Sequence, residues 1–128
     1  MITFPLRSMV LAGALAAAAA SILPAPAVAR TIFDGSWSVL IITDRGQCDR
    51  AYRYGLQIVN GNVIYDGGGP ITLQGRVAPN GAVRVSVASG GQRADGTGRL
   101  SRDRGTGVWR GAGSSASCSG TWEAERRG

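Results

Sequence analysis

The sequence predicts an all-β domain of about eight antiparallel strands, connected as an up-and-down meander that closes into a small barrel. Apolar and polar residues alternate with period two from about residue 35 to about residue 125, and no stretch of this region shows a helical period. Turns rich in Gly, Asn and Pro interrupt the alternation, and these connections are too short to link parallel strands. Barrel closure would pair both edges of the sheet, and a two-sheet sandwich is the alternative.

The first half of this region supplies three strands. A first strand is expected over residues 35–43 and a second over residues 52–58, each with apolar residues at every other position. The second strand ends at Asn60-Gly61, a pair typical of the type I′ turn that joins two hairpin strands. A short third strand over residues 63–66 is expected to end at the Gly-Gly-Gly-Pro sequence that follows it.

The second half supplies five further strands. They are expected over residues 71–77, 83–87, 92–101, 107–111 and 118–125. The sequence Pro79-Asn80-Gly81 predicts a tight turn between the first two of them. Glycines on the expected inner face would permit the tight coiling of a small barrel. These glycines are Gly75, Gly96, Gly98, Gly107 and Gly120.

Three Gly-x-Trp units place a glycine two residues before each tryptophan. The units end at Trp37, Trp109 and Trp122. A glycine on the same face as the tryptophan leaves a gap into which an indole from the same strand or a neighbouring strand can fold. The units are therefore interpreted first as core packing, and stacking of one indole on a ligand is the alternative.

The chain divides into four segments. Arg7, an apolar run and the small-residue ending Ala27-Val28-Ala29 predict that residues 1–29 are a cleaved secretion signal peptide. Residues 30–34 are expected to form a flexible N-terminal segment, residues 35–125 a single β-barrel-like domain and residues 126–128 a C-terminal tail. The protein is then expected in the periplasm or outside the cell, with no transmembrane segment after signal cleavage.

Two cysteines occur in the chain, Cys48 and Cys118. An even number of cysteines in an exported chain predicts a disulfide, because the compartment is oxidising. This bridge would close a loop of about 70 residues and stabilise the domain by roughly 4 to 5 kcal/mol. Two free thiols are the alternative.

Positive charge comes from arginine alone, since the chain has fourteen Arg, no Lys and no His. Without Arg7 there are thirteen arginines against eight acidic residues, a net charge of about +5. Several arginines are expected on the outer face, where they could form an anion-binding surface. They are Arg53, Arg76, Arg84, Arg99 and Arg110. Aromatic residues are not interleaved with them, which argues against a nucleic-acid partner.

The residue types that catalysis needs are scarce. Without His or Lys, and with its cysteines expected to be oxidised, the chain offers no general base with an activating partner. No catalytic residue, metal site or cofactor is therefore predicted. A haem would need an axial ligand from Tyr52, Tyr54, Tyr65 or a reduced Cys, yet the first two tyrosines lie on an apolar stripe where packing is the commoner role.

The segments Phe33-Asp34-Gly35-Ser36-Trp37, 48–54 and 118–122 are similar to those of small exported single-disulfide proteins of Gram-negative bacteria, some of which carry haem-utilisation or adhesion labels. The architecture also resembles the eight-stranded barrels of periplasmic protease inhibitors and lipocalins. The resemblance to the inhibitors implies inhibition through the N-terminal segment. Their disulfide, however, joins cysteines much closer in sequence than those of this chain.

The sequence favours an exported, non-enzymatic binding module of the bacterial envelope. In the first hypothesis its surface contacts an anionic envelope component or another protein, and aromatic residues fill the interior. These residues are Trp37, Tyr52, Tyr54, Trp109 and Trp122. In the second, the interior carries a small apolar ligand, and a void lined by Trp37, Trp109 and Gly96 would favour it. Periplasmic protease inhibition is the third.

Overall fold

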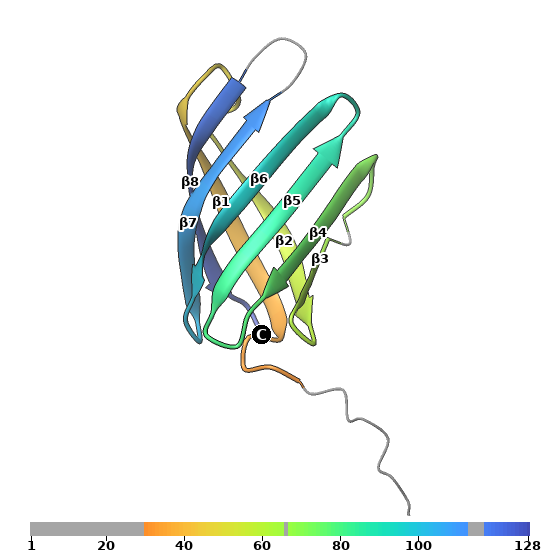
Figure 1. Cartoon of the computed structure of the whole chain (residues 1–128), viewed down its shortest axis with the longest axis vertical. Coiled ribbons are helices and arrows are strands. Elements are labelled where there is room, and N and C mark those ends of the chain that lie inside the picture. The colour runs from red at the N-terminus through yellow and green to blue at the C-terminus, as the bar shows by residue number, and fades with distance from the viewer. Residues whose placement is uncertain (1–29, 66, 113–116) are drawn as a thin grey trace, which may run out of the picture.

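The computed structural model describes residues 30–65, 67–112 and 117–128, so the expected signal peptide lies outside the described residues. The described residues form a closed barrel of eight antiparallel strands in chain order (Figure 1), which confirms the predicted meander. The strands are β1 (Gly35–Arg45), β2 (Ala51–Val59), β3 (Asn62–Ile64), β4 (Ile71–Val77), β5 (Ala82–Ser89), β6 (Gln92–Leu100), β7 (Arg104–Ala112) and β8 (Ser117–Arg126).

Strand β1 closes the barrel, because it pairs with β2 on one edge and with β8 on the other. Ile41 lies opposite Tyr52 of β2 and opposite Trp122 of β8. Since side chains alternate across a strand, this register directs the apolar face of every strand inward. The ten buried core residues are Phe33, Trp37, Val39, Ile58, Val63, Val77, Val83, Leu100, Trp122 and Ala124.

Glycines of β6 and β7 make room for the indole of Trp122. Trp122 lies opposite Gly107 of β7, which in turn lies opposite Gly98 of β6. A Cβ atom at Gly107 would come within 2.5 Å of the Trp122 ring, and one at Gly98 would also collide with it. The prediction that a glycine accommodates an indole of a neighbouring strand is therefore confirmed here.

The glycine of the first Gly-x-Trp unit, Gly35, has a different role. Gly35 adopts a positive φ of 138°, and a Cβ atom there would collide with the carbonyl oxygen of Gly128. That same oxygen accepts a hydrogen bond from the Ser36 amide at 2.9 Å. Gly35 therefore permits the chain end to approach β1, and it makes no room for Trp37.

We call the end of the barrel with the β2–β3, β4–β5 and β6–β7 turns the base, and the opposite end the rim. The C-terminus lies at the base (Figure 1). Residues 31–34, expected to be flexible, are attached there. Phe33 is 4% exposed and its carbonyl accepts the Trp37 indole N–H at 2.9 Å. The Asp34 carboxylate accepts the amides of Asn60 at 2.7 Å and Gly61 at 3.1 Å.

Arg126, expected to begin a C-terminal tail, is the last residue of β8 and organises the base. Its guanidinium donates to the carbonyl oxygens of Asp34, Ile32 and Arg102. The same group lies 4.9 Å from the centroid of the Trp37 ring, within the range of a cation–π interaction. The chain end and the N-terminal segment are therefore joined across the base.

At the rim, a disulfide joins Cys48 of the β1–β2 connection to Cys118 of β8, as predicted. Buried Thr43 holds the same connection, because its hydroxyl donates to the Asp49 carbonyl at 2.6 Å and its amide to the Arg50 carbonyl. A formed disulfide is suited to an oxidising, extracytoplasmic environment.

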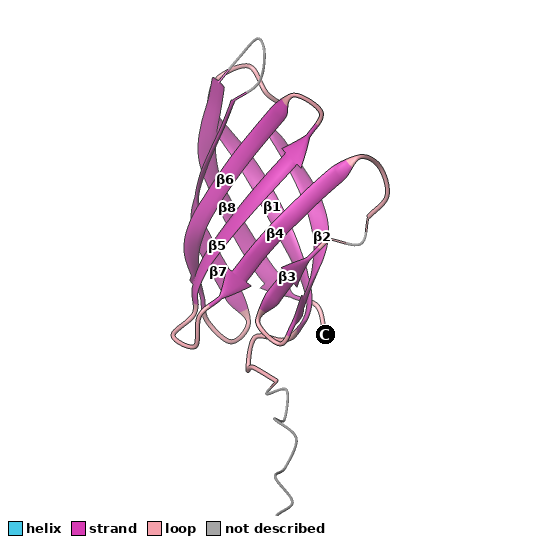
Figure 2. Cartoon of the chain, turned by 45° about the vertical axis from the view of Figure 1, so that its right-hand side comes forward, coloured by secondary structure: helices cyan, strands magenta, loops and turns pink. Residues whose placement is uncertain are grey.

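Strand β3 is shorter than predicted. It ends at Ile64, whereas the alternation predicted a strand to residue 66. In Figure 2, residues 67–70 curve outward from the beginning of β4, and among the described residues no strand lies between β2 and β4 beyond Ile64.

A candidate apolar binding site inside the barrel

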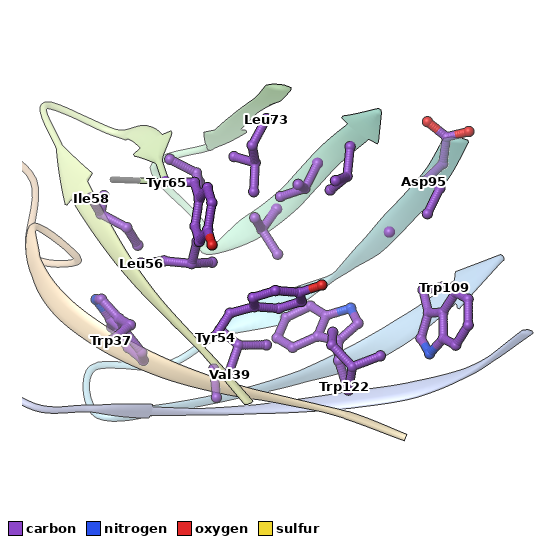
Figure 3. Close-up of a pocket in the computed structure, with 18 of the residues that line it drawn as sticks. Trp37, Val39, Tyr54, Leu56, Ile58, Tyr65, Leu73, Asp95, Trp109 and Trp122 are labelled. Atoms are coloured by element: carbon purple, nitrogen blue, oxygen red, sulfur yellow. The ribbon is translucent and has the colours of Figure 1, made fainter. Parts of the chain in front are cut away.

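The barrel interior contains a cavity of about 160 Å³. Side chains of all eight strands line it, together with Tyr65 just after β3, and they are almost entirely aliphatic or aromatic. All five aromatic residues proposed from the sequence as ligand- or core-lining are in this wall. They are Trp37, Tyr52, Tyr54, Trp109 and Trp122. Figure 3 shows that Trp109 and Trp122 approach the cavity from the side opposite Leu73 and Tyr65.

The three indole N–H groups are all used within the protein. Trp37 donates to the Phe33 carbonyl and Trp109 to the Ile42 carbonyl, both at 2.9 Å. Trp122 donates to the Thr97 carbonyl at 3.2 Å. Because each donor already has an acceptor, the indoles present only their apolar rings to a ligand.

Three tyrosines form an edge-to-face cluster at the cavity wall. The ring centroid of Tyr54 lies 5.2 Å from that of Tyr52 and 5.8 Å from that of Tyr65. Burial, reinforced by the two neighbouring tyrosines, raises the pKa of Tyr54 to about 12. A hydrogen bond with the Tyr52 side chain stabilises the neutral form, so the Tyr54 hydroxyl already has a partner within the wall. In Figure 3 this hydroxyl is directed toward the interior of the cavity.

The volume of the cavity limits what can enter it. An apolar protein cavity of about 150 Å³ is large enough to bind benzene, whereas pockets for larger ligands measure roughly 300 to 1,000 Å³. A single six-membered ring or a short branched alkyl group therefore fits the 160 Å³ cavity of this barrel.

The outer face does not gather all five predicted arginines. Arg76 lies directly opposite Arg84, and Arg99 lies diagonally across from Arg84 on β6. Arg53 instead lies opposite Leu40 of β1, and Arg110 lies opposite Asp95. All five side chains are exposed, as predicted, but only those on β4, β5 and β6 are neighbours.

Two residues that organise the closed base were not predicted as functional or structural anchors, namely Phe33 and Arg126. Phe33 stands before the first alternating run, and Arg126 stands after the last one, so the alternation could not place them. The alternation of apolar residues in β4 and β5 does predict the aliphatic side chains that these strands contribute to the cavity wall, among them Leu73 and Val85.

Among residues 30–65, 67–112 and 117–128, no group of three or more His, Cys, Asp and Glu side chains could hold a metal ion. No helix in these ranges is long and apolar enough to cross a membrane. No family model, curated protein or solved structure matches the chain.

Proposed function

We propose that this chain is an exported, non-enzymatic binding protein, periplasmic or secreted, which carries one small apolar molecule inside its barrel. The observation that supports the proposal is the interior cavity of about 160 Å³, whose wall includes Trp37, Trp109 and Gly96. A barrel that served only as a scaffold for surface contacts would gain stability from filling this space, because each buried methylene group contributes about 0.8 kcal/mol.

The wall chemistry defines the ligand as neutral and mostly hydrocarbon. Apolar carbon dominates the surface, so a charged group placed there would lose its hydration without compensation. The Tyr54 hydroxyl is neutral and already forms a hydrogen bond with Tyr52, so it adds no charge to this wall. A ligand of about seven non-hydrogen atoms is then expected to bind with a Kd on the order of 0.1 to 1 mM.

The other two hypotheses have weaker support. The anion-binding surface depended on five arginines, of which three are neighbours on the outer face. Protease inhibition depended on a flexible N-terminal segment, yet Phe33 is buried and the Asp34 carboxylate accepts two backbone amides. Trimming residues 30–34 would therefore destabilise the barrel as well as remove a candidate inhibitory segment.

Filling the cavity tests the proposal. A Cβ atom added at Gly96 would meet its nearest neighbours at 3.6 to 3.8 Å, so a side chain there can extend into the void without a collision. Gly55 is the matched control, because it lies on the outer face of β2 with nothing within 4 Å of an added Cβ atom. Gly96→Leu should weaken binding at least about 10-fold, and Gly55→Leu should leave it unchanged.

Toluene and p-cresol are suitable probes, and tryptophan fluorescence with ligand-observed NMR gives the readout. Far-ultraviolet circular dichroism verifies that both variants fold, and Gly96→Ala provides a smaller, graded change. Absence of binding to the wild-type protein, or equal binding by Gly96→Leu and Gly55→Leu, would refute the carrier function.

A further inference from the structure

The charges on the barrel wall are distributed unevenly around it. Strands β2 to β5 contain Arg53, Arg76 and Arg84 but no acidic residue. Strand β8, which lies across the barrel from β4 in the closed strand order, contains Glu123 and Glu125. The outer surface over the middle strands is therefore positively charged without compensation from its own strands.

Three arginines of this wall lie together near the base. Arg76 is the next-to-last residue of β4, Arg84 the third residue of β5 and Arg99 the next-to-last residue of β6. Side chains directly opposite each other, such as Arg76 and Arg84, have Cβ atoms roughly 5 Å apart, and diagonal neighbours, such as Arg84 and Arg99, roughly 7 to 8 Å. We call these three exposed arginines the basic face.

The hydrogen bonds of the basic face go to neutral groups. Arg76 donates to the Asn62 side-chain oxygen at 2.7 Å, and Arg99 donates to the Asn80 carbonyl at 3.3 Å. Neither of the ion pairs found within the described residues involves these arginines. An arginine side chain is always charged and has five N–H donors, so most donors of the basic face remain available.

Asp95 of β6 is the acidic side chain closest in register to the basic face. It is a diagonal neighbour of Arg84, but its carboxylate accepts the Ser86 hydroxyl at 2.7 Å and it lies directly opposite Arg110. Like charges directly opposite each other destabilise a sheet, and no carboxylate of the described residues pairs with Arg76 or Arg84. A bound anion would therefore stabilise this part of the wall.

Exposed aliphatic side chains continue the basic face on one side. Val59 lies opposite Asn62, and Asn62 lies opposite Arg76, so one outward row leads from β2 to the arginines. Val59 is 43% exposed, and Ile64, two residues beyond Asn62 on β3, is 42% exposed. Arginines beside exposed aliphatic groups are suited to the headgroup boundary of a bilayer, where phosphate and hydrocarbon meet.

A soluble polyanion such as single-stranded nucleic acid is a poorer match for this surface. Such a partner is bound through aromatic side chains on which its bases stack. All three tryptophans and all three tyrosines of the chain line the cavity, so none is available on the outer wall. The aliphatic residues beside the arginines would also gain nothing from a purely ionic partner.

We propose that the basic face, together with Val59 and Ile64, is a peripheral binding surface for an anionic lipid bilayer. The three guanidinium groups pair with lipid phosphates, and the two aliphatic side chains enter the headgroup boundary. The surface uses outward side chains only, so this proposal does not rest on the carrier function.

Co-sedimentation with vesicles tests the proposal directly. Residues 30–128 contain the whole barrel and are used so that the apolar run of the expected signal peptide cannot insert. This protein should bind phosphatidylcholine vesicles with about 30 mol% phosphatidylglycerol, but not vesicles of phosphatidylcholine alone. Binding should weaken at least about 10-fold between about 50 and 300 mM NaCl, because salt screens exposed charges.

Matched double variants locate the surface. Arg76→Gln/Arg84→Gln should weaken binding to the anionic vesicles about 10- to 30-fold, since each arginine near such a bilayer contributes roughly fivefold. Arg45→Gln/Arg50→Gln makes the same charge change at the rim, beside the β1–β2 connection, and should weaken binding less than about threefold. Far-ultraviolet circular dichroism verifies that both variants fold. Equal weakening by the two pairs, or equal binding of the wild-type protein to neutral and anionic vesicles, would overturn the proposal.

Heparin and a further variant separate a bilayer from a soluble polyanion. Val59→Ser/Ile64→Ser should weaken vesicle binding about 3- to 10-fold and leave retention on heparin unchanged, because only lipid offers hydrocarbon. Heparin binding without vesicle binding would overturn the proposal, as would unchanged vesicle binding by this variant. With a spin-labelled lipid, NMR signals of residues 59–64 should broaden more than those of residues 46–50. The reverse order would place the rim on the bilayer and contradict the proposal as well.

Discussion

At the residue scale, the tryptophans and glycines of β7 and β8 form reciprocal cross-strand pairs. Gly107 lies opposite Trp122, and Trp109 lies opposite Gly120. The Trp122 indole also donates to the Thr97 carbonyl across the intervening strand, which requires the ring to lie close to the wall. The absence of side chains at Gly98 and Gly107 is therefore part of the packing of Trp122.

This pairing leads to a prediction for Gly107→Ala. An added Cβ atom would collide with the Trp122 ring and with the Thr97 carbonyl, so the variant should lose about 1 to 3 kcal/mol of unfolding free energy. Gly55→Ala is the control, since nothing lies within 4 Å of the new methyl group. Urea unfolding of both variants provides the measurement. A Gly107→Ala protein as stable as Gly55→Ala would show that the indole does not require this space.

The sequence was sufficient to predict a packing role for the Gly-x-Trp units but not the partner of each glycine. Alternation places Gly107 on the face of Trp109, yet the indole it accommodates belongs to Trp122, one strand further along. Gly35 has the same spacing from its tryptophan, but its missing side chain allows the Gly128 carbonyl at the chain end to approach β1. Cross-strand register decides between these uses, and a two-residue motif contains no information on register.

At the element scale, the N-terminal segment depends on one carboxylate that attaches it to the β2–β3 turn. Burial acts to raise the pKa of Asp34, but hydrogen bonds from the Thr31 hydroxyl and the amides of Asn60 and Gly61 outweigh it, so the pKa lies below 3.8. A carboxyl group with a lowered folded-state pKa stabilises the fold above its unfolded pKa, and this stabilisation is lost as pH falls through the folded value.

Asp34→Asn should therefore reduce the unfolding free energy at pH 7 by about 1 kcal/mol and flatten its decline below about pH 4. Asp44→Asn makes the same charge change at an exposed position of the rim and serves as the control. Thermal unfolding between pH 2 and 7 measures both effects. Parallel pH profiles for wild type and Asp34→Asn would contradict this role of the carboxylate.

The third strand shows where alternation is not sufficient to define an element. Val63 and Tyr65 maintain the inward pattern, so a strand to residue 66 was expected, but pairing ends at Ile64. Alternation reports which side of a sheet a residue faces, whereas the end of a strand depends on whether neighbours remain within hydrogen-bonding distance. The end of β3 at Ile64 therefore could not be predicted from the sequence.

At the scale of the whole molecule, the arginines show that alternation predicts which face of the sheet a residue occupies but not its neighbours on the adjacent strands. Their outward orientation followed from alternation, and all five are exposed. Their grouping did not, because strand stagger places Arg76 opposite Arg84 but Arg110 opposite Asp95. The barrel fold, the disulfide and the aromatic cavity wall were predictable, since each depends on side-chain face or residue type more than on stagger.

The two ends of the barrel are stabilised by different means, which leads to a prediction about the disulfide. The base is joined through Asp34 and Arg126, and the rim is joined by the bridge between Cys48 and Cys118, 70 residues apart in sequence. A Cys48→Ser/Cys118→Ser variant should lose about 4 kcal/mol, because its unfolded chain is no longer constrained by the loop. Urea unfolding of the variant, and of wild type with reductant, measures this loss.

Amide hydrogen exchange should locate the effect at the rim. Without the bridge, amides of the β1–β2 connection and of the first residues of β8 should exchange faster under native conditions, since local opening there no longer stretches a covalent link. The exchange rates of the amides of residues 34–37 should rise only as far as the loss of global stability requires. Arg126 still donates to the Asp34 and Ile32 carbonyls and holds this end of the barrel. Uniform acceleration over both ends would mean that the bridge acts only through the unfolded state.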